Sequence, residues 1–403
     1  MRRPNTHRTE TDLTRRALMR LLCAVPVAGL PLAGHTSRVT AETTPLAAPS
    51  VTAASVFVQD ASAGVPLMEM NADERRQPSS TTKIVTAQVV TENAGLDELV
   101  VVDAADLATL EESQMGLFAG DTLTVQQLLE GALIPSGNDA ARTLARHVGL
   151  KLLEGAGGEP IPRFVEAMNA YVASVNLENT NFANAEGLDD PNQYSSARDL
   201  AILGARVMRN KTISAIVSQP TLNVTSVGFE ARVYLDPVTA APKLNSNQLL
   251  EGAPVGMADV HGLKTGTTPD GGANLIVAKW SSGGNRIIAV VMGSDIAYDD
   301  AGYQVLDSDR RYEDMRAILA EVEASFAWVD PNDDDQLPGL TNELAAWQVS
   351  LRNSSAIVMS TEISQPVRYQ LELVAPSAEE TLAGRVLFFA GSELLAERPL
   401  TFR

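Results

Sequence analysis

The spacing of apolar residues predicts a series of amphipathic helices. From Ser80 to Asn93 the apolar side chains fall on one face of a helix, at Ile84, Val85, Val89 and Val90. The same kind of pattern predicts further helices at residues 124–132, 138–148, 162–175, 196–209 and 310–328. We expect these helices to surround a central sheet.

Two later segments have the composition of strands in the centre of a sheet. Residues 272–281 and 286–293 are rich in apolar and β-branched side chains, which suit central strands. Residues 56–69 predict two shorter strands joined by a turn at residues 61–64. A sheet with helices around it predicts an α/β (α+β) catalytic domain, which we place at residues 55–330.

The pattern changes after the acidic run at residues 330–335. In residues 367–373 apolar and polar side chains alternate with the period of two that marks a half-buried strand. Residues 383–402 predict a hairpin that turns at residues 390–392. We therefore expect a small C-terminal all-β domain at residues 338–403.

The N-terminus has the pattern of an export signal. A basic segment precedes an apolar run from Leu21 to Gly34, and small residues follow at residues 39–41. We predict a signal peptide at residues 1–41 and, because the next residues are small and without period, a linker at residues 42–54.

The export route and the fate of this segment stay open. The pair Arg15-Arg16 resembles a twin-arginine signal, although paired arginines also occur in ordinary signals. The apolar run holds two prolines and about 14 residues, whereas a spanning helix needs roughly 20. We expect no stable membrane anchor after signal removal and a location in the periplasm or extracytoplasmic cell envelope. An uncleaved membrane tether is the alternative.

Charge, cysteine and histidine content exclude several classes of function. The net charge of −19 argues against non-specific nucleic-acid binding, so we expect no nucleic-acid partner. The one cysteine, Cys23, lies within the predicted signal, which excludes disulfides and thiol catalysis from the mature protein. The four histidines lack the spacing of metal ligands, and we expect no metal or other cofactor.

A candidate nucleophile stands at the start of a predicted helix, in the segment PSSTTK at residues 78–83. Positions three apart share a helix face, so the Ser80 hydroxyl and the Lys83 amine can meet. Serine needs a base to become a nucleophile, and a lysine whose pKa is lowered by burial or a nearby cation can serve. The structural alternative is a helix-capping serine with a solvated lysine.

A second candidate element lies between two predicted helices, in the segment PSGNDA at residues 135–140. A loop tip there can face a cleft, where Ser136 can pass a proton and Asn138 can hydrogen-bond a peptide amide. The alternative is a helix-capping turn. The same Ser-x-Asn pattern at residues 174–176 lies late in a predicted helix, and we interpret it as structural.

A third element enters the predicted sheet in the segment HGLKTGTT at residues 261–268. Lys264 would place a second cation beside Lys83 and favour the neutral form of Lys83. Thr265 has a hydroxyl that can bind a substrate carboxylate, and Gly266 would let a substrate approach the strand edge closely. The chain has only six lysines, so a chance occurrence of two of them in the S-x-x-K and K-T-G arrangements is less expected.

Together and in this order, the three elements resemble a known set. The motifs S-x-x-K, S-D-N and K-T-G occur in penicillin-binding proteins and class A β-lactamases. The runs PSSTTK, PSGNDAA and HGLKTGTT are most similar to the D-alanyl-D-alanine carboxypeptidases, the low-molecular-mass penicillin-binding proteins. The resemblance covers roughly residues 55–328. It implies a β-lactamase/transpeptidase-like domain with a central antiparallel sheet flanked by helices, followed by the small β domain.

The resemblance also implies a role for each matching residue. Catalytic roles fall to Ser80 as the acylated nucleophile, Lys83 as its base, and Ser136. Substrate-binding roles fall to Asn138, Lys264, Thr265, Gly266, Thr267 and Arg311. The backbone N–H groups of Ser80 and Thr267 would form the oxyanion hole. Arg311 would lie near the terminal carboxylate of the substrate, with the adjacent Arg310 as the alternative.

The implied activity is removal of the terminal D-alanine from peptidoglycan stem pentapeptides, through an acyl-enzyme and without a cofactor. The implied partners are the stem peptides, with β-lactams as covalent inhibitors. One alternative is a D,D-endopeptidase of the same superfamily that cuts cross-links; another is a non-catalytic envelope protein that binds peptidoglycan. A class A β-lactamase is disfavoured because the sequence has no E-x-x-L-N run for a deacylating glutamate.

The sequence departs from the family pattern at several places. Thr267 stands where the family often has a histidine, and His261 stands where an acidic residue is usual. Insertions are expected at residues 152–162 and 226–242. These departures bear on substrate preference more than on the reaction.

Overall fold

The computed structural model describes residues 44–155, 157–228, 231–253, 255–299, 305, 308–374 and 382–402. The predicted signal peptide, residues 1–41, lies outside these residues. Within the described ranges, no helix combines the length and the apolar composition that crossing a membrane requires.

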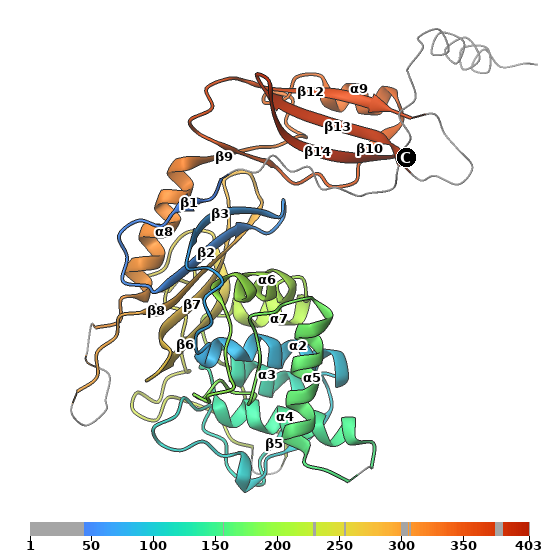
Figure 1. Ribbon diagram of the computed structural model, residues 1–403. Helices are drawn as coiled ribbons and strands as arrows, with labels where there is room; N and C mark the ends of the chain where they lie inside the picture. The colour runs from blue at the N-terminus through green and yellow to red at the C-terminus, as the bar shows by residue number, and fades with distance from the viewer. Residues whose placement is uncertain are drawn as a thin grey trace, which may run out of the picture. The chain divides into compact units, whose positions relative to one another are not determined.

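A six-stranded sheet forms the centre of the fold, in the order β1-β3-β2-β8-β7-β6 (Figure 1). Its strands are β1 (Leu46–Ala47), β2 (Ser55–Asp60), β3 (Val65–Met70), β6 (Val260–Thr268), β7 (Gly272–Trp280) and β8 (Arg286–Ser294). Neighbouring strands pair antiparallel except β1 and β3, which are parallel. The central antiparallel sheet implied by the resemblance is therefore confirmed.

Each central strand presents apolar side chains to both faces of the sheet. Strand β8 places Ile288, Val290 and Met292 in one core and Ile287, Ala289 and Val291 in the other. Side chains alternate between the faces of a strand, so a strand covered on both sides must be apolar at nearly every position. This explains the continuous apolar runs at residues 272–281 and 286–293.

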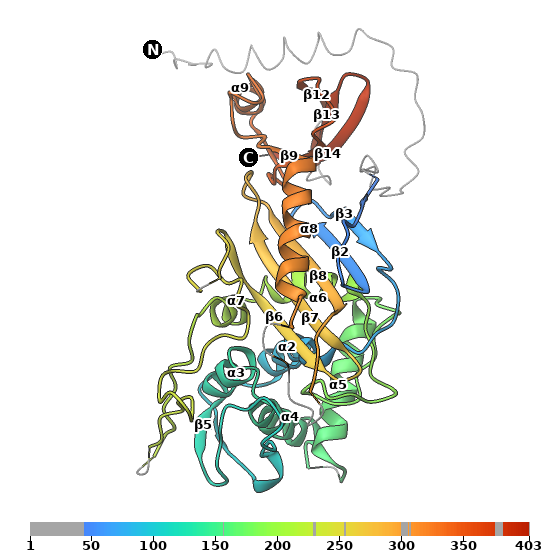
Figure 2. The same cartoon turned by 90° about the vertical axis from the view of Figure 1, so that its left-hand side faces the viewer.

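Helices cover both faces of the sheet (Figure 2). One face carries α2 (Lys83–Asn93), α3 (Val125–Leu133), α4 (Asn138–Leu153), α5 (Pro160–Ser174), α6 (Ala197–Val207) and α7 (Lys211–Val217). The other face carries α8 (Arg311–Ser325), through Met315, Ile318, Leu319 and Val322. A short sheet of β4 (Leu99–Val101) and β5 (Thr122–Thr124) lies beside the helical group.

The predicted helices are found within a few residues of their expected ends. Two differences have a physical reason. The first turn at Ser79–Thr82 is a 3₁₀ helix, η1, before α2 begins at Lys83. The helix expected at residues 310–328 ends at Ser325, because the chain continues as strand β9 (Phe326–Val329).

Residues 44–54 belong to the fold, so the predicted linker at residues 42–54 is wrong over its described part. Strand β1 pairs with β3. Thr52 and Ala53 donate hydrogen bonds of 2.7–2.9 Å to the Asp314 carboxylate in α8. A strand of two residues shows no period in the sequence, which is why composition suggested a linker.

A second sheet near the C-terminus has the strand order β10-β14-β13-β12. Its strands are β10 (Val349–Leu351), β12 (Val367–Leu373), β13 (Leu382–Ala390) and β14 (Glu393–Phe402), which confirms the predicted strand and hairpin. One short helix, α9 (Leu340–Ala346), contributes Leu340 and Leu344 to the core of this region, which otherwise consists of strands as expected. Strand β9 pairs with β11 (Ile357–Ser360). This pairing joins the two expected domains, residues 55–330 and 338–403. The boundary between them stays a prediction.

A buried carboxylate ties the end of β2 to two distant segments. Asp60 accepts hydrogen bonds from Asn285 Nδ2 at 2.7 Å and from Trp328 Nε1 at 2.8 Å. The backbone N–H groups of Ser62 and Ala63 donate to its other oxygen. Burial raises the pKa of Asp60, while the four donors favour the ionised form.

Replacing Asp60 by alanine is expected to destabilise the protein, because it leaves buried donors without an acceptor. The expected loss is about 3 kcal/mol of unfolding free energy. Urea unfolding followed by circular dichroism measures this change. Asp97→Ala, at an exposed carboxylate, is the control and should change stability by less than about 0.5 kcal/mol. Equal losses in the two variants would contradict the role of Asp60.

Candidate active site

The Ser80 hydroxyl and the Lys83 amine meet at the junction of η1 and α2. Lys83 Nζ lies 2.7 Å from Ser80 Oγ. It also donates to Asn138 Oδ1 and to the Glu186 carbonyl oxygen, each at 2.7 Å. All three N–H bonds of the ammonium form therefore have an acceptor. The alternative of a solvated lysine is wrong, because Lys83 is 0% exposed.

The buried position of Lys83 lowers its affinity for a proton. Burial is the largest cause and brings the pKa of Lys83 down from 10.5 to about 7. The Glu186 carboxylate acts in the opposite direction, and the Arg142 guanidinium lowers the pKa further. An amine with this pKa can be neutral near pH 7 and can accept the Ser80 proton.

The backbone before Ser80 is held in an uncommon conformation. Ser79 has φ +50°, in the left-handed region that non-glycine residues rarely adopt. Its hydroxyl contacts Thr268 Oγ1 at 2.8 Å and accepts a hydrogen bond from Asn274 Nδ2 at 3.1 Å. Strands β6 and β7 thus fix the turn that points Ser80 toward Lys83.

Two glycines let neighbouring segments approach this turn closely. A Cβ on Gly266 would lie 3.0 Å from Ser80 N and 2.9 Å from Ser79 Cβ. A Cβ on Gly187, where φ is +95°, would lie 2.0 Å from Ser79 O. Gly266 is therefore needed for packing of β6 against η1, a reason that the sequence pattern alone did not indicate.

The predicted middle element lies at the start of α4, directly beside Lys83. Ser136 is buried and has φ +66°. Within the described part of the chain its hydroxyl has no hydrogen-bond partner. Asn138 contacts Lys83 through Oδ1 and donates from Nδ2 to Glu112 Oε2 at 2.8 Å. Asn138 therefore orients the lysine, and its expected hydrogen bond to a peptide amide stays a prediction.

The third predicted element lies on β6, the strand at one edge of the sheet. Lys264 is buried, and burial first, then the charges of Lys83 and Arg311, hold its pKa well below 10.5. Thr265 Oγ1 donates to Ser246 Oγ at 2.6 Å. Ser246 in turn donates its backbone N–H to Ile134 O, next to the Ser136 turn. Ser246 links the second and third elements and was missed in the sequence because it belongs to no motif.

Arg311, rather than Arg310, faces β6. Its guanidinium donates to Gly266 O at 2.8 Å and to the Thr267 hydroxyl, and it pairs with Asp309 at 2.8 Å. Arg310 is exposed and pairs with Glu313. Of the two arginines that the sequence left open, Arg311 is therefore the one that contacts β6, and its role toward the substrate stays a prediction.

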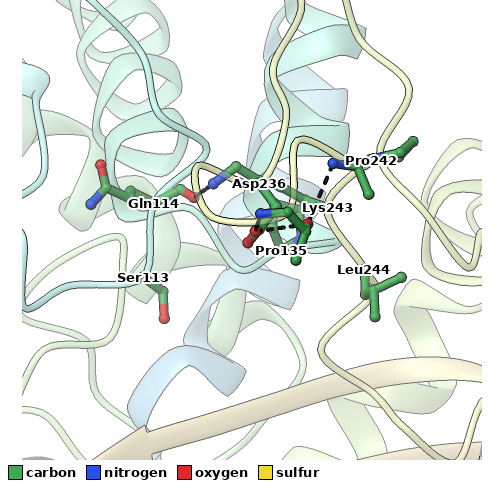
Figure 3. Close-up of a pocket in the computed structure, with 9 residues that line it drawn as sticks. Ser113, Gln114, Pro135, Asp236, Pro242, Lys243 and Leu244 are labelled. Atoms are coloured by element: carbon green, nitrogen blue, oxygen red, sulfur yellow. Dashed lines mark hydrogen bonds between the residues drawn. The ribbon is translucent and has the colours of Figure 1, made fainter.

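A cavity of about 530 Å³ opens beside the middle element (Figure 3). Its lining comes from three segments: Ser113 and Gln114; Pro135; and Asp236, Thr239, Ala241, Pro242, Lys243 and Leu244. Lys243 Nζ donates to Gln114 O at 3.2 Å across it. The third segment overlaps residues 226–242, where an insertion is expected, so this stretch of the chain shapes the surroundings of the middle element.

Three charged residues near Asn138 were not singled out in the sequence. Glu112 accepts from Asn138 and from Arg142, whose Nη2 lies 2.6 Å from Glu112 Oε2. Arg142 Nε lies 2.9 Å from Glu186 Oε1, and the backbone of Glu186 contacts Lys83. These residues are far apart in the chain and fit no motif. The one available signal was an arginine one turn into the helix that Asn138 begins.

The model of the D-alanyl-D-alanine carboxypeptidase family, peptidase S11, matches residues 40–296. The chain belongs to this family. Relatives include D-alanyl-D-alanine carboxypeptidase DacC of Escherichia coli, 30% identical, with 88% of this chain and 84% of that protein matched. DacA of Haemophilus influenzae is 34% identical over 61% of this chain and 58% of its own length.

Solved structures of similar proteins agree with this family and fold. Penicillin binding protein 5 of Haemophilus influenzae has a TM-score of 0.64 and 26% identity, and covers 88% of this chain and 97% of its own. The Streptomyces K15 DD-transpeptidase has a TM-score of 0.58 and 29% identity, and covers 68% of this chain and 98% of its own. The predicted family, fold class and serine-type D-Ala-D-Ala carboxypeptidase activity are confirmed at the level of the family.

Replacing Gly187 by alanine is expected to slow the acylation of Ser80 strongly while leaving the fold intact. The added Cβ would push the Ser79–Ser80 backbone away from Lys83, and a displacement near 1 Å can cost about 100-fold in rate. The rate of acylation by a fluorescent penicillin measures the effect. Gly120→Ala is a matched control, since Gly120 has φ +90° and open space at its Cβ position. Equal rates in the two variants would contradict the steric explanation.

Proposed function

We propose that the protein removes the terminal D-alanine of peptidoglycan stem peptides through an acyl-enzyme on Ser80. The observation that carries this proposal is the 2.7 Å contact between Ser80 Oγ and a fully buried Lys83 amine. Family membership supplies the class of reaction. The lowered pKa of Lys83, about 7, suits a general base near neutral pH.

The reaction begins with neutral Lys83 taking the proton of the Ser80 hydroxyl. Ser80 Oγ forms a bond to the carbonyl carbon of the penultimate D-alanine. The C–N bond to the terminal D-alanine then breaks, and its nitrogen leaves as an amine after receiving a proton through the Ser136 hydroxyl. Water attacks the ester, and Ser80 regains its proton as the shortened peptide departs.

The opposite wall binds the peptide in this proposal. The backbone N–H groups of Ser80 and Thr267 stabilise the oxyanion, as the resemblance implies. Lys264 and Thr265 contribute an amine and a hydroxyl from β6, and Gly266 keeps this strand close to Ser80. Arg311 supplies the positive charge nearest to Thr267, which favours a substrate that ends in a free carboxylate.

We place this activity in the periplasm or the extracytoplasmic cell envelope. The basic and apolar pattern of residues 1–41 supports export. The peptidoglycan substrate of this family requires the same location. The region from about residue 338 onward is proposed as a separate β-rich domain attached to the catalytic domain expected at residues 55–330, which also includes β1.

Labelling by penicillin tests the acyl-enzyme directly. Mature protein incubated with a labelled penicillin should gain one adduct on Ser80, located by peptide mass spectrometry. Ser80→Ala should gain none, while Ser79→Ala retains the nucleophile and should still be labelled. Labelling that is unchanged in Ser80→Ala would overturn the proposed nucleophile.

The product separates this function from its alternatives. Release of free D-alanine from a pentapeptide identifies a carboxypeptidase, while cleavage of cross-linked dimers identifies a D,D-endopeptidase. The structural relative from Streptomyces K15 is named a DD-transpeptidase, so transfer to an added amine is measured in the same assay.

A change at Arg311 tests recognition of the carboxylate. In Arg311→Gln, kcat/KM for a peptide ending in D-alanine should fall roughly 10- to 100-fold, because a charge-assisted contact is lost. The same peptide ending in D-alaninamide should be affected much less. Arg310→Gln is the adjacent control and should leave both substrates unchanged. An equal loss for both substrates in Arg311→Gln would show that Arg311 acts only by holding β6.

A further inference from the structure

We propose that Glu112, Arg142 and Glu186 form an ionic clamp that positions Asn138 and Lys83, and that its cation, Arg142, keeps Lys83 able to act as a base. This inference rests on the proposed function and assigns to these three residues a positioning role in it. None of them is placed in contact with the substrate.

The clamp joins three segments that are distant in the sequence. Arg142 lies on α4, one turn after Asn138, while Glu112 and Glu186 lie on the loops before α3 and before α6. The guanidinium reaches Glu112 Oε2 at 2.6 Å through Nη2 and Glu186 Oε1 at 2.9 Å through Nε. The side chains of Arg142, Glu112 and Glu186 are 18%, 13% and 9% exposed. Ion pairs with so little exposure are screened less than surface pairs.

Glu112 determines how the Asn138 amide is oriented. Its carboxylate only accepts hydrogen bonds, so the group of Asn138 that faces it at 2.8 Å must be the amide NH₂ group. The other end of the amide, Oδ1, is thereby turned to Lys83 Nζ at 2.7 Å. With the amide reversed, Asn138 would present donors to an amine that is itself a donor when charged.

Glu186 acts on Lys83 from a second direction. Its backbone carbonyl accepts the third hydrogen bond of Lys83, and its carboxylate is held by Arg142. Residue 187 follows as the glycine that allows this loop to touch Ser79. Fixing the Glu186 side chain therefore also fixes the carbonyl that holds the lysine.

The cation of Arg142 balances the acids that face Lys83. Those acids are Glu186, Glu112 and Asp139, and each favours the charged form of Lys83. Asp139 is itself engaged with the backbone N–H groups of residues 115–117. On the side of the sheet, the amines of Lys83 and Lys264 interact, since the charge of Lys83 lowers the pKa of Lys264. Without Arg142, two carboxylates would face Lys83 uncompensated and would hold its proton.

The pH dependence of acylation distinguishes positioning from mere stabilisation. In the wild-type protein, the rate of acylation of Ser80 by penicillin should rise through the Lys83 pKa of about 7. In Arg142→Met this rise should move up by about one pH unit, lowering the rate about fivefold at pH 7 and about tenfold well below pH 7. The rate should recover at pH 9 to 10, since Lys83 is neutral there.

Arg146→Met is the matched control. Arg146 lies one turn further along α4 and pairs with the buried Asp106 at 2.7 Å, away from Lys83. It should lose stability to a similar extent, measured as the melting temperature, and keep the wild-type pH profile. Parallel profiles for wild type, Arg142→Met and Arg146→Met would overturn the inference.

Two substitutions of Glu112 separate the effect of its charge from the effect of its hydrogen bond to Asn138. They test the positioning role of the clamp even if Arg142→Met does not fold. Glu112→Gln keeps an oxygen for Asn138 but removes an anion that favours charged Lys83. Its acylation should persist, with the rise shifted to lower pH. Glu112→Ala removes the acceptor and should acylate more slowly at every pH. Equal behaviour of the two variants would overturn the clamp.

The same assay reports on the proposed function separately. Absence of an adduct on Ser80 in the wild-type protein would overturn both the acyl-enzyme and the clamp. A labelled wild type whose pH profile is shared by all the variants would overturn the clamp alone.

Discussion

The site depends on burying an amine that must still give up and take back a proton. Lys83 is wholly shielded from solvent, and a charged amine in that place is costly unless each of its N–H bonds finds an acceptor. Three acceptors surround it: a serine hydroxyl, a side-chain amide and a backbone carbonyl. Burial lowers the pKa of Lys83, and the three hydrogen-bond acceptors limit how far the pKa falls. Its neighbours are arranged to keep these two effects in balance.

The same constraint explains the unusual backbone around the nucleophile. A hydroxyl and an amine at this distance require η1, β6 and the loop at Gly187 to meet with almost no space between them. Left-handed conformations at Ser79 and Ser136 make the two turns possible. Each such residue costs on the order of 1–3 kcal/mol, so the surrounding structure must hold it. The apolar cores on both faces of the sheet supply that rigidity.

Sequence patterns located the main elements of the fold and the motif residues of the site. Apolar runs and helical spacing marked β7, β8, α2 and α4 because these elements bury whole faces. The contact between Ser80 and Lys83 could be predicted because the two residues are three positions apart on a helix. The contacts of Glu112, Arg142 and Glu186 could not be inferred, since contacts between a helix and two distant loops leave no local period in the sequence. For the same reason Gly266 was interpreted through its motif, while its packing against η1 needed coordinates.

The hydrogen bonds from Thr52 and Ala53 to Asp314 also bear on how the chain folds. The two ends of the Thr52–Asp314 contact are separated by 262 residues, and Asp60 and Asn285 are separated by 225. Strand β2 therefore lies in the middle of a sheet whose neighbour on one side is made much later. Contacts of such long sequence separation require closure of a large loop, which slows folding. Strand β2 lacks this neighbour until β8 (Arg286–Ser294) has been synthesised, which leaves an apolar edge exposed during much of the protein's synthesis.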